Sequence, residues 1–539
     1  MQAFSLTRSN GVIAVLFLLL MIPAVLVHLH CVVHPSDDAF ITFRYVQNFL
    51  SGQGLVYNQN ERVFGSTTPL YTFWLVALKS LFPGYELSVL SIRLNIIPFA
   101  CMAAGVYALI CRVCRHRLVA MGCCAYLMLS PLILETSISG MESMFFLSFM
   151  IWSMVATLSG RLGLGGFLAG CAMLSRPEGI FCLLPIAFML DWRDRASWKA
   201  PVVGVGVPVL LWVGFASLYF GSPVPHSIIA KAAPLYDLRP GLTLSVLLDQ
   251  LHAFVFVDLF DGLSGLQRGG IYVALLCALC YSWAFKRGEL PTLAVGSVSA
   301  VVFLFYAYTN PLMMHWYWAL VKVSAVLFFA LGFRSGCQLL MESFPDYRSR
   351  IGSVAMGVFC LWAVAVPALE WLRYSSAIQS YSLDPFSMTR DKNSEINRIH
   401  AYREAGEWLN ANRGETLPVV AAPEIGALGF AYRGPILDTC GLVSPRVVRY
   451  HPIPKEEMGG ILGSAPSALI RELVPPIIVT APGFIQGGIL KDPVFRQRYQ
   501  IVHKVPLRAG EYARSREILI LEFRTDEMVE SSNKPTVDD

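Results

Sequence analysis

The sequence predicts a polytopic α-helical membrane protein with a soluble α/β domain at its C-terminal end. Of the 539 residues, 55% are hydrophobic and only 15% are charged, whereas soluble domains carry about 25% charge. Long apolar runs fill residues 1–374, and the composition changes near residue 375. We therefore divide the chain into a membrane domain (1–374), a soluble domain (375–525) and a polar tail (526–539) that we expect to be disordered.

Eleven apolar runs predict membrane-spanning helices, because about 20 apolar residues cross a bilayer. The first, residues 11–33, is too long and too weakly flanked for a cleaved signal peptide, so we expect a retained anchor. The others cover residues 87–110, 118–134, 141–158, 162–174, 180–190, 200–220, 270–285, 290–308, 312–333 and 351–369. The two short runs beside residues 175–179 predict broken helices that meet at Pro177, which must be buried against protein or water.

Basic residues between alternate runs predict how the chain is oriented. With a cytoplasmic N-terminus, the clusters at residues 112–117, 161, 193–199, 286–287 and 334–350 all face the cytoplasm. The aromatic run 69–82 must then lie in the membrane surface as an interfacial helix. Outer loops 34–86 and 221–269 consequently share the outer side with the soluble domain, and within the second loop residues 242–260 predict an amphipathic or interfacial helix.

The soluble domain begins with a predicted helix, because residues 391–412 have apolar side chains at helical spacing. Six short β-like runs follow: LPVVAA, GFAYRG, PILDT, PPIIVTAP, YQIVHKV and EILILEF. We expect a compact α/β domain that ends near Phe523. Most of the thirteen cysteines lie in apolar runs, where Cys acts as a small hydrophobe. We therefore expect neither a disulfide framework nor a structural metal site.

An acidic pair, Asp37 and Asp38, follows the first apolar run directly. Adjacent carboxylates repel each other, and desolvation near lipid makes it costlier to keep both charged. Acids at this depth mark a site for a partner or substrate, although a solvated loop with incidental acids is the alternative. The chain shows no GxGxxG after a strand and no Walker loop, and no basic cluster with interleaved aromatics indicates nucleic acid.

The acidic pair belongs to a longer stretch, DDAFITFRYVQNFLSGQGLVYN…ERVFGSTTPL, which resembles the first outer loop of GT-C glycosyltransferases. It is most similar to the terminal β-arabinofuranosyltransferases of bacterial cell envelopes. SGMES (139–143), LSRPEG (174–179), YFGSPVPHSIIAK (219–231) and EIGALGFAYRGPILDTCGL (424–442) resemble that family's later motifs in order. The resemblance implies a GT-C fold of about 11 transmembrane helices in a bacterial inner membrane, with a periplasmic soluble domain. It also implies transfer of a pentose, arabinofuranose, from a polyprenyl-phosphate donor to an envelope glycan, lipid or surface-protein acceptor.

This reaction needs a carboxylate that acts as a base or stabilises the developing sugar cation. In related enzymes the first acid of the pair has this role, so we choose Asp37, with Asp38 as the alternative. Cations must hold the leaving phosphate, and our candidates are Arg44, Arg176, His226, Lys231 and His315. Candidates for binding the sugar or acceptor are Tyr57, Asn58, Glu142 and Glu178.

Structural alternatives remain for several of these residues. Asp38 orients Asp37 or binds Arg44, Arg176 pairs with Glu178 inside the protein, and His315 belongs to an interfacial aromatic belt. Tyr57 and Asn58 form a turn. A divalent cation, for which Asp37, Asp38 and Glu142 are the candidate ligands, is left open; we expect no other cofactor.

Two rival functions also remain: a transporter or flippase for lipid-linked sugar, and a non-catalytic glycan-binding scaffold. A transporter often shows internal repeats and charged residues near mid-membrane, whereas the charged candidates here gather at one face. The intact acidic pair disfavours a scaffold. The sequence leaves the sugar, the acceptor, inversion or retention of stereochemistry, and the oligomeric state undetermined.

Overall fold

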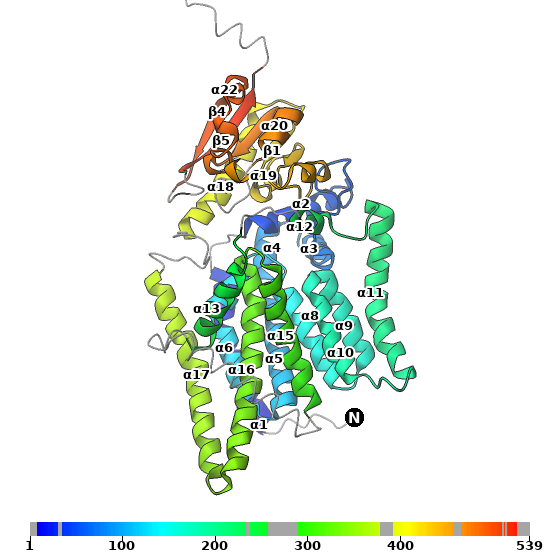
Figure 1. The fold of residues 1–539 in the computed structure, drawn as a ribbon, viewed down its shortest axis with the longest axis vertical. Coiled ribbons are helices and arrows are strands. Elements are labelled where there is room, and N and C mark those ends of the chain that lie inside the picture. The colour runs from blue at the N-terminus through cyan, green and yellow to red at the C-terminus, as the bar shows by residue number, and fades with distance from the viewer. Residues whose placement is uncertain are drawn as a thin grey trace, which may run out of the picture.

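The structure, a computed structural model, describes residues 8–30, 35–232, 238–256, 289–377, 392–457, 465–508, 511 and 515–524. It consists of a long helical bundle with an α/β unit packed against one end (Figure 1). The bundle comes from the first two thirds of the chain, and the α/β unit from the last third.

Six stretches among the described residues are long and apolar enough to cross a membrane. They are α1 (Arg8–His30), α4 with α5 (Leu87–Arg93 and Ile96–Cys114), α11 (Ala196–Phe220), α15 (Leu290–Thr309), α16 (His315–Ser343) and η2 with α17 (Pro345–Tyr347 and Arg348–Ala377). The pair α6 (Arg117–Leu129) and α7 (Pro131–Ser137) is bent by 63° and is a seventh candidate if it counts as one span. The predicted span 270–285 lies outside the described residues, so the total of eleven stays a prediction.

The predicted runs around SRPEG form helices that are shorter than a normal span. These are α8 (Ser143–Leu158), α9 (Leu162–Ser175), η1 (Pro177–Cys182) and α10 (Leu183–Met189). As predicted, the helix breaks beside Pro177, because Arg176 is extended, with φ −158° and ψ 146°. Gly179 then packs so closely on α9 that a Cβ would lie 2.3 Å from the backbone of Ala172. Close packing against protein therefore holds the break, as such a break requires.

The predicted outer loops form short helices at the end of the bundle that carries the α/β unit. The first loop gives α2 (Asp37–Leu50) and α3 (Pro69–Leu81), which is the predicted interfacial segment and is too short to be a candidate span. The second gives α12 (His226–Ala232) and α13 (Leu242–Phe256). Figure 1 shows α2, α3 and α12 between the bundle and the α/β unit.

The α/β unit is built on a five-stranded mixed sheet in the order β2-β1-β3-β5-β4. The parallel strand β1 (Val420–Ala422) lies between β2 (Ile436–Asp438) and β3 (Ile477–Thr480), and β5 (Glu517–Phe523) runs antiparallel to β3 and β4 (Tyr499–Pro506). The predicted helix is α18 (Lys392–Asn412). The remaining helices are α19 (Gly426–Ala431), η3 (Pro445–Tyr450), η4 (Lys455–Glu457), α20 (Ser467–Leu473), α21 (Pro482–Ile485), η5 (Ile489–Lys491) and α22 (Pro493–Arg498).

Five of the six predicted strand runs contain strands, but the prediction for GFAYRG is wrong. Most of this run lies in and just after α19. The glycines of α19 let the first outer loop approach closely, because a Cβ on Gly429 would lie 1.9 Å from the hydroxyl of Tyr57. Tertiary packing therefore overrides the local strand pattern here. The predicted disordered tail, 526–539, lies outside the described residues.

One buried apolar cluster continues from the first outer loop into the α/β unit. Phe40 and Phe43 of α2 share it with Tyr402 of α18 and Leu428 of α19. The ring of Phe430 packs 5.2 Å from Phe40 and 6.0 Å from Phe43, between ring centroids. Because such a core excludes water and lipid from both sides of the contact, the two segments must lie on the same side of the membrane.

This packing predicts the outcome of labelling with a membrane-impermeant maleimide. Asn60→Cys and Gln497→Cys, both at exposed positions, should be labelled from the same side of the membrane, and Arg195→Cys only after permeabilisation. The unmodified chain is the background control. Labelling of the first two positions from opposite sides would contradict the packing, and labelling of both only after permeabilisation would contradict the predicted orientation.

Candidate active site

The first turn of α2 meets the first turn of α19. Oδ1 of Asp37 accepts a hydrogen bond from the N–H of Ala427 at 2.8 Å, and Oδ2 from the N–H of Gly426 at 3.1 Å. These are N–H groups that a helix leaves unpaired at its start. A Cβ on Gly426 would lie 1.9 Å from the carbonyl oxygen of Asp37, so only glycine permits this approach. Asp37 therefore joins the first outer loop to the α/β unit.

The surroundings of Asp37 are dry and charged. Burial raises the pKa of Asp37 to about 7, while the Arg398 guanidinium and the Ala427 N–H lower it and Glu424 raises it further. Arg398 and Glu424 form an ion pair at 2.5 Å. The pKa of Asp37 thus lies near neutrality, within the contact between α2 and the α/β unit.

Two turns along the same face of α2, Arg44 is buried and fully hydrogen-bonded. Nε donates to the carbonyl of Tyr57 (2.7 Å), Nη1 to those of Gly429 (2.5 Å) and Tyr432 (3.2 Å), and Nη2 to that of Gly434 (2.8 Å). Nη2 also lies 3.5 Å from Oδ1 of Asn58. These contacts occupy all five donors of the guanidinium. Asp37 and Arg44 thus share a face of α2, and the contacts favour a docking role for Arg44 over binding of phosphate.

Tyr57 and Asn58, our candidates for sugar binding, have the same kind of partners. The hydroxyl of Tyr57 donates to the carbonyl of Ile425 at 2.6 Å. The amide of Asn58 donates to the carbonyl of Ile436 at 2.8 Å and accepts from its N–H at 2.9 Å. Both side chains are buried. They dock the first outer loop on the α/β unit, and the predicted role in sugar binding finds no support in these contacts.

Asp38 differs from its neighbour. Its side chain is half-buried, and among the residues that the structure describes none donates a hydrogen bond to its carboxylate. Lys231 of α12, whose side chain is exposed, lies within electrostatic reach. Tyr317 raises the pKa of Lys231, desolvation lowers it, and Asp38 raises it further, so that the net shift is upward. The first and second outer loops thus bring an unengaged carboxylate and an accessible ammonium into one neighbourhood.

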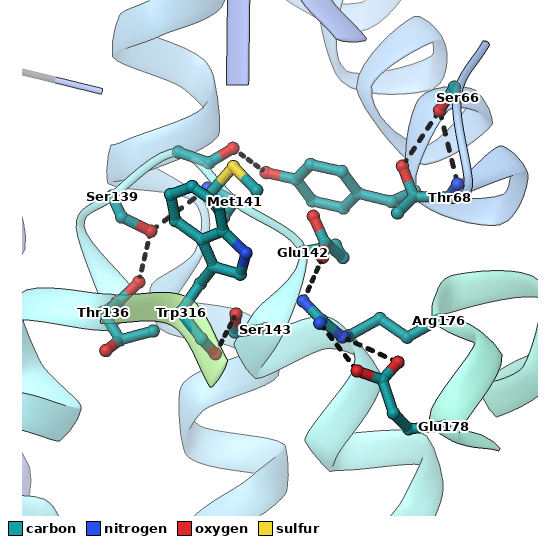
Figure 2. Close-up of polar contacts among 12 residues, drawn as sticks. Ser66, Thr68, Thr136, Ser139, Met141, Glu142, Ser143, Arg176, Glu178 and Trp316 are labelled. Atoms are coloured by element: carbon teal, nitrogen blue, oxygen red, sulfur yellow. Dashed lines mark hydrogen bonds and ion pairs between the residues drawn. The ribbon is translucent and has the colours of Figure 1, made fainter. Parts of the chain in front are cut away.

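A buried ion cluster lies beside this pair (Figure 2). Nη1 of Arg176 lies 2.6 Å from Oε1 of Glu142, and Nη2 lies 2.9 Å from Oε1 of Glu178, which also accepts a hydrogen bond from the hydroxyl of Tyr306 at 2.8 Å. The alternative in which Arg176 pairs with Glu178 is therefore confirmed. Burying these charges is tolerable because each has a partner. The cluster joins the SGMES and LSRPEG motifs, and its charges also act on Lys231.

The two histidines reach the site in different ways. Nε2 of His315 lies 2.9 Å from Oγ of Ser36, the residue before Asp37, so the start of α16 is tied to the acidic pair. His226 is fixed through its backbone, which donates to the carbonyl of Phe64 at 2.6 Å. Burial lowers the pKa of His226, which favours its neutral form and makes it a weaker phosphate ligand.

Near Asp38 the structure thus brings together five of the candidates: Lys231, Arg176, Glu142, Glu178 and His315. Three others lie apart from them along α19: Arg44, Tyr57 and Asn58. The sequence interpretation missed Ser36 and Tyr317. The ring centroid of Tyr317 lies 5.0 Å from Cζ of Arg176. Its one sequence signal was its place two residues after His315.

Two of the three candidate ligands for a divalent cation, Asp37 and Glu142, are already engaged, which leaves Asp38 as the single accessible carboxylate of the three. Both oxygens of Asp37 accept backbone hydrogen bonds, and Glu142 pairs with Arg176. Within the described ranges no group of three or more His, Cys, Asp or Glu side chains is arranged to hold a metal ion. The residues present therefore do not fit this cation.

Parts of this chain are similar to known sequences. Residues 393–521 match the family model of a domain of unknown function (DUF8728). The terminal β-(1→2)-arabinofuranosyltransferase of Mycobacterium tuberculosis is 29% identical over 224 residues, which cover 37% of this chain and 35% of that relative. The matched region thus spans about a third of the relative's length. The predicted resemblance to arabinofuranosyltransferases is confirmed.

Solved structures show which fold this is. ArnT from Cupriavidus metallidurans, in the apo state, is similar with a TM-score of 0.56 and 13% identity, over 96% of this chain and 98% of that chain. The oligosaccharyltransferase AglB from Archaeoglobus fulgidus, in complex with an inhibitory peptide and a dolichol-phosphate, gives a TM-score of 0.51 and 14% identity, over 95% and 76%. Both are GT-C enzymes. At these identities the likeness shows a shared fold.

The raised pKa of Asp37 predicts a pH dependence of stability. Its native pKa of about 7 exceeds the ordinary value of 3.8, so the native state holds the proton more tightly than the unfolded state. The stability that this group contributes is present below about pH 4 and is lost as the pH rises through about 7. Relative to Asp37→Asn, the melting temperature of the parent protein in detergent should therefore fall between pH 4 and pH 7 and then level off. A difference that does not vary with pH would contradict the raised pKa.

Proposed function

We propose that this protein is an integral-membrane glycosyltransferase that transfers a pentose, arabinofuranose, from a polyprenyl-phosphate donor to an envelope glycan on the outer face of a bacterial inner membrane. The observation that carries the proposal is the meeting of Asp38, Lys231 and the Arg176 cluster under the α/β unit, from four motifs that are separate in the chain. The name of the M. tuberculosis relative supports the sugar, and the dolichol-phosphate bound to AglB supports a lipid-linked donor.

Asp38 is the better placed of the two acids for the reaction. A general base must come within hydrogen-bond reach of the hydroxyl proton that it removes. Asp37 is 9% exposed, and both its oxygens are held by backbone N–H groups, whereas the Asp38 carboxylate is accessible. We therefore assign the reacting carboxylate to Asp38 and a positioning role to Asp37, which reverses the order suggested by the resemblance alone.

Lys231 is the cation best suited to the leaving phosphate. Arg176 is neutralised by two carboxylates, Arg44 is occupied by carbonyls, and the lowered pKa of His226 favours its neutral form. Lys231 remains exposed, and its pKa is raised, which keeps the ammonium charged. A fixed positive charge aimed at developing negative charge is an effective catalytic device. His315, held by Ser36, is the second candidate donor.

One observation favours the rival transporter. Lys322 of α16 and Glu370 of α17 form a buried ion pair inside the bundle, which our expectation of charges at one face only did not include. The carboxylate of Glu370 also accepts from the hydroxyl of Ser130 at 3.1 Å, beside the bend between α6 and α7. The pair is neutral as a whole and joins three spans. Such a pair fits a structural link between helices as well as an element of a transport path. A transfer assay therefore has to distinguish the two functions.

The first test is transfer by Asp38→Asn. A positioned base contributes roughly 10²–10⁴-fold, so single-turnover transfer from a synthetic polyprenyl-phosphate arabinofuranose should fall at least roughly 10²-fold, with donor affinity preserved. Purified protein in nanodiscs is assayed for product and for donor binding. Near-normal transfer at saturating donor would contradict the assignment of Asp38 as the reacting carboxylate, whereas donor binding without any transfer by the parent protein would favour the flippase.

A matched pair of variants separates docking from chemistry. Gly426→Ala disturbs the approach of α19 to Asp37 without altering either carboxylate. If Asp37 acts by positioning, Asp37→Asn and Gly426→Ala should both lower the melting temperature and reduce transfer by similar factors. A large loss of transfer in Asp37→Asn, with Gly426→Ala close to the parent rate, would return the reacting role to Asp37.

Lys231→Gln tests the phosphate site. Hydrogen bonds to charged groups contribute about 1.5–3 kcal/mol, so donor binding should weaken by roughly 10–150-fold. Lys491→Gln, an exposed lysine of η5 in the α/β unit, is the control and should bind donor normally. Equal donor affinity in the two variants would remove Lys231 from the site.

A further inference from the structure

A cleft lies between the C-terminal half of α2 and the end of α19, on the far side of Arg44 from the acidic pair. It encloses about 320 Å³ and is lined by Gln47, Asn48, Gln53, Gln59, Phe430 and Arg433, among others. The reaction proposed above uses none of these side chains. The cleft joins the first outer loop to the α/β unit, so its shape depends on their docking.

The walls of the cleft are held rigidly while part of its lining is unengaged. Asn410 of α18 donates to the carbonyl of Ala431 at 2.9 Å and accepts from the N–H of Arg433 at 3.1 Å. The amide of Asn48 donates to the carbonyls of Val56 and Tyr57, both at 2.9 Å. These bonds fix the backbone on both sides. A site whose surroundings are fixed loses less entropy when it binds.

Three glutamine side chains, Gln47, Gln53 and Gln59, are exposed around this rigid frame. No residue in the described part of the chain makes a hydrogen bond to their amide groups. Each amide offers two donors and an acceptor, which matches a sugar hydroxyl because that group also donates and accepts. The half-buried ring of Phe430 adds an apolar surface, as carbohydrate C–H faces require. A hydroxyl-rich chain therefore fits the lining.

Other ligand chemistries fit less well. The lining residues include no carboxylate to hold a cation. A phosphate group would need several free cationic donors, but Arg44 is fully occupied and only Arg433 is exposed. A lipid chain would need an apolar lining, which three glutamines do not give. The composition of the cleft thus selects a neutral glycan.

The position of the cleft relates it to the acidic pair. Gln47 follows Asp38 by nine residues on α2, so their backbones lie about 14 Å apart along the helix at 1.5 Å per residue, and at about 100° per residue their side chains point to opposite sides of it. An acceptor that fills the cleft must therefore pass around α2 to reach Asp38. We propose that the α2–α19 cleft is a subsite for the acceptor glycan, which holds the chain a few sugar residues away from the end that reacts near Asp38. This inference rests on the proposed transferase function.

The test compares long and short acceptors on the full-length protein in nanodiscs. The variant Gln47→Ala/Gln53→Ala/Gln59→Ala changes only exposed side chains, and Gln497→Ala on α22, at the opposite end of the α/β unit, is the control. Binding of an arabinofuranosyl hexasaccharide and of a disaccharide is measured by saturation-transfer NMR without donor. KM and kcat for both acceptors are measured with donor. Melting temperatures check that the variants are folded.

The triple variant should bind the hexasaccharide at least about tenfold more weakly, since each lost hydrogen bond contributes a several-fold factor. Its KM for the hexasaccharide should rise, with kcat and the KM for the disaccharide near the parent values. Parent-like hexasaccharide binding, or equal losses for both acceptors, would overturn the subsite. Because binding is measured without turnover, weakened hexasaccharide binding supports the subsite even if the parent protein transfers no sugar, in which case only the proposed reaction fails.

Discussion

The contact between α2 and α19 determines how the rest of the site is arranged. A carboxylate, Asp37, lies at the start of α19 and a guanidinium, Arg44, binds carbonyls at its end. These are the signs of charge that a helix dipole favours at its two ends. Because the partners are nearly 400 residues apart in the chain, the contact closes a very long loop. It fixes Asp38 and supports both walls of the glutamine-lined cleft.

The site separates charges that hold the structure from charges that are free to react. Asp37 and Arg44 are engaged in docking α2 on the α/β unit, and Arg176 forms ion pairs with both Glu142 and Glu178. Buried charges persist only when they are paired in this way. What remains accessible is one carboxylate, Asp38, and one ammonium, Lys231. A leaving phosphate needs the ammonium, and an acceptor hydroxyl needs the carboxylate.

The sequence predicts those features that depend on local composition. Apolar length identified most candidate spans and agrees with α3 being too short for one, and Pro177 located the helix break. Features that depend on distant backbone groups were not predictable. Nothing in GFAYRG shows that its first glycine, Gly429, is needed for the approach of Tyr57. The polar partners of Arg44 and Asn58 are mainly carbonyl and N–H groups, which every residue carries, so residue type alone suggested ligand binding instead of docking.

Helix geometry explains why two adjacent acids take different roles. Successive residues on a helix point about 100° apart, because there are 3.6 residues per turn. Since Asp37 points at α19, Asp38 points away from it, and its charge acts on Lys231 of α12. The pair is therefore not redundant: one carboxylate cannot replace the other without rotating α2. Such a rotation would pull Arg44 from its carbonyls and open the apolar cluster around Phe40 and Phe43. The docking of α2 thus constrains which of the two acids can reach the substrate.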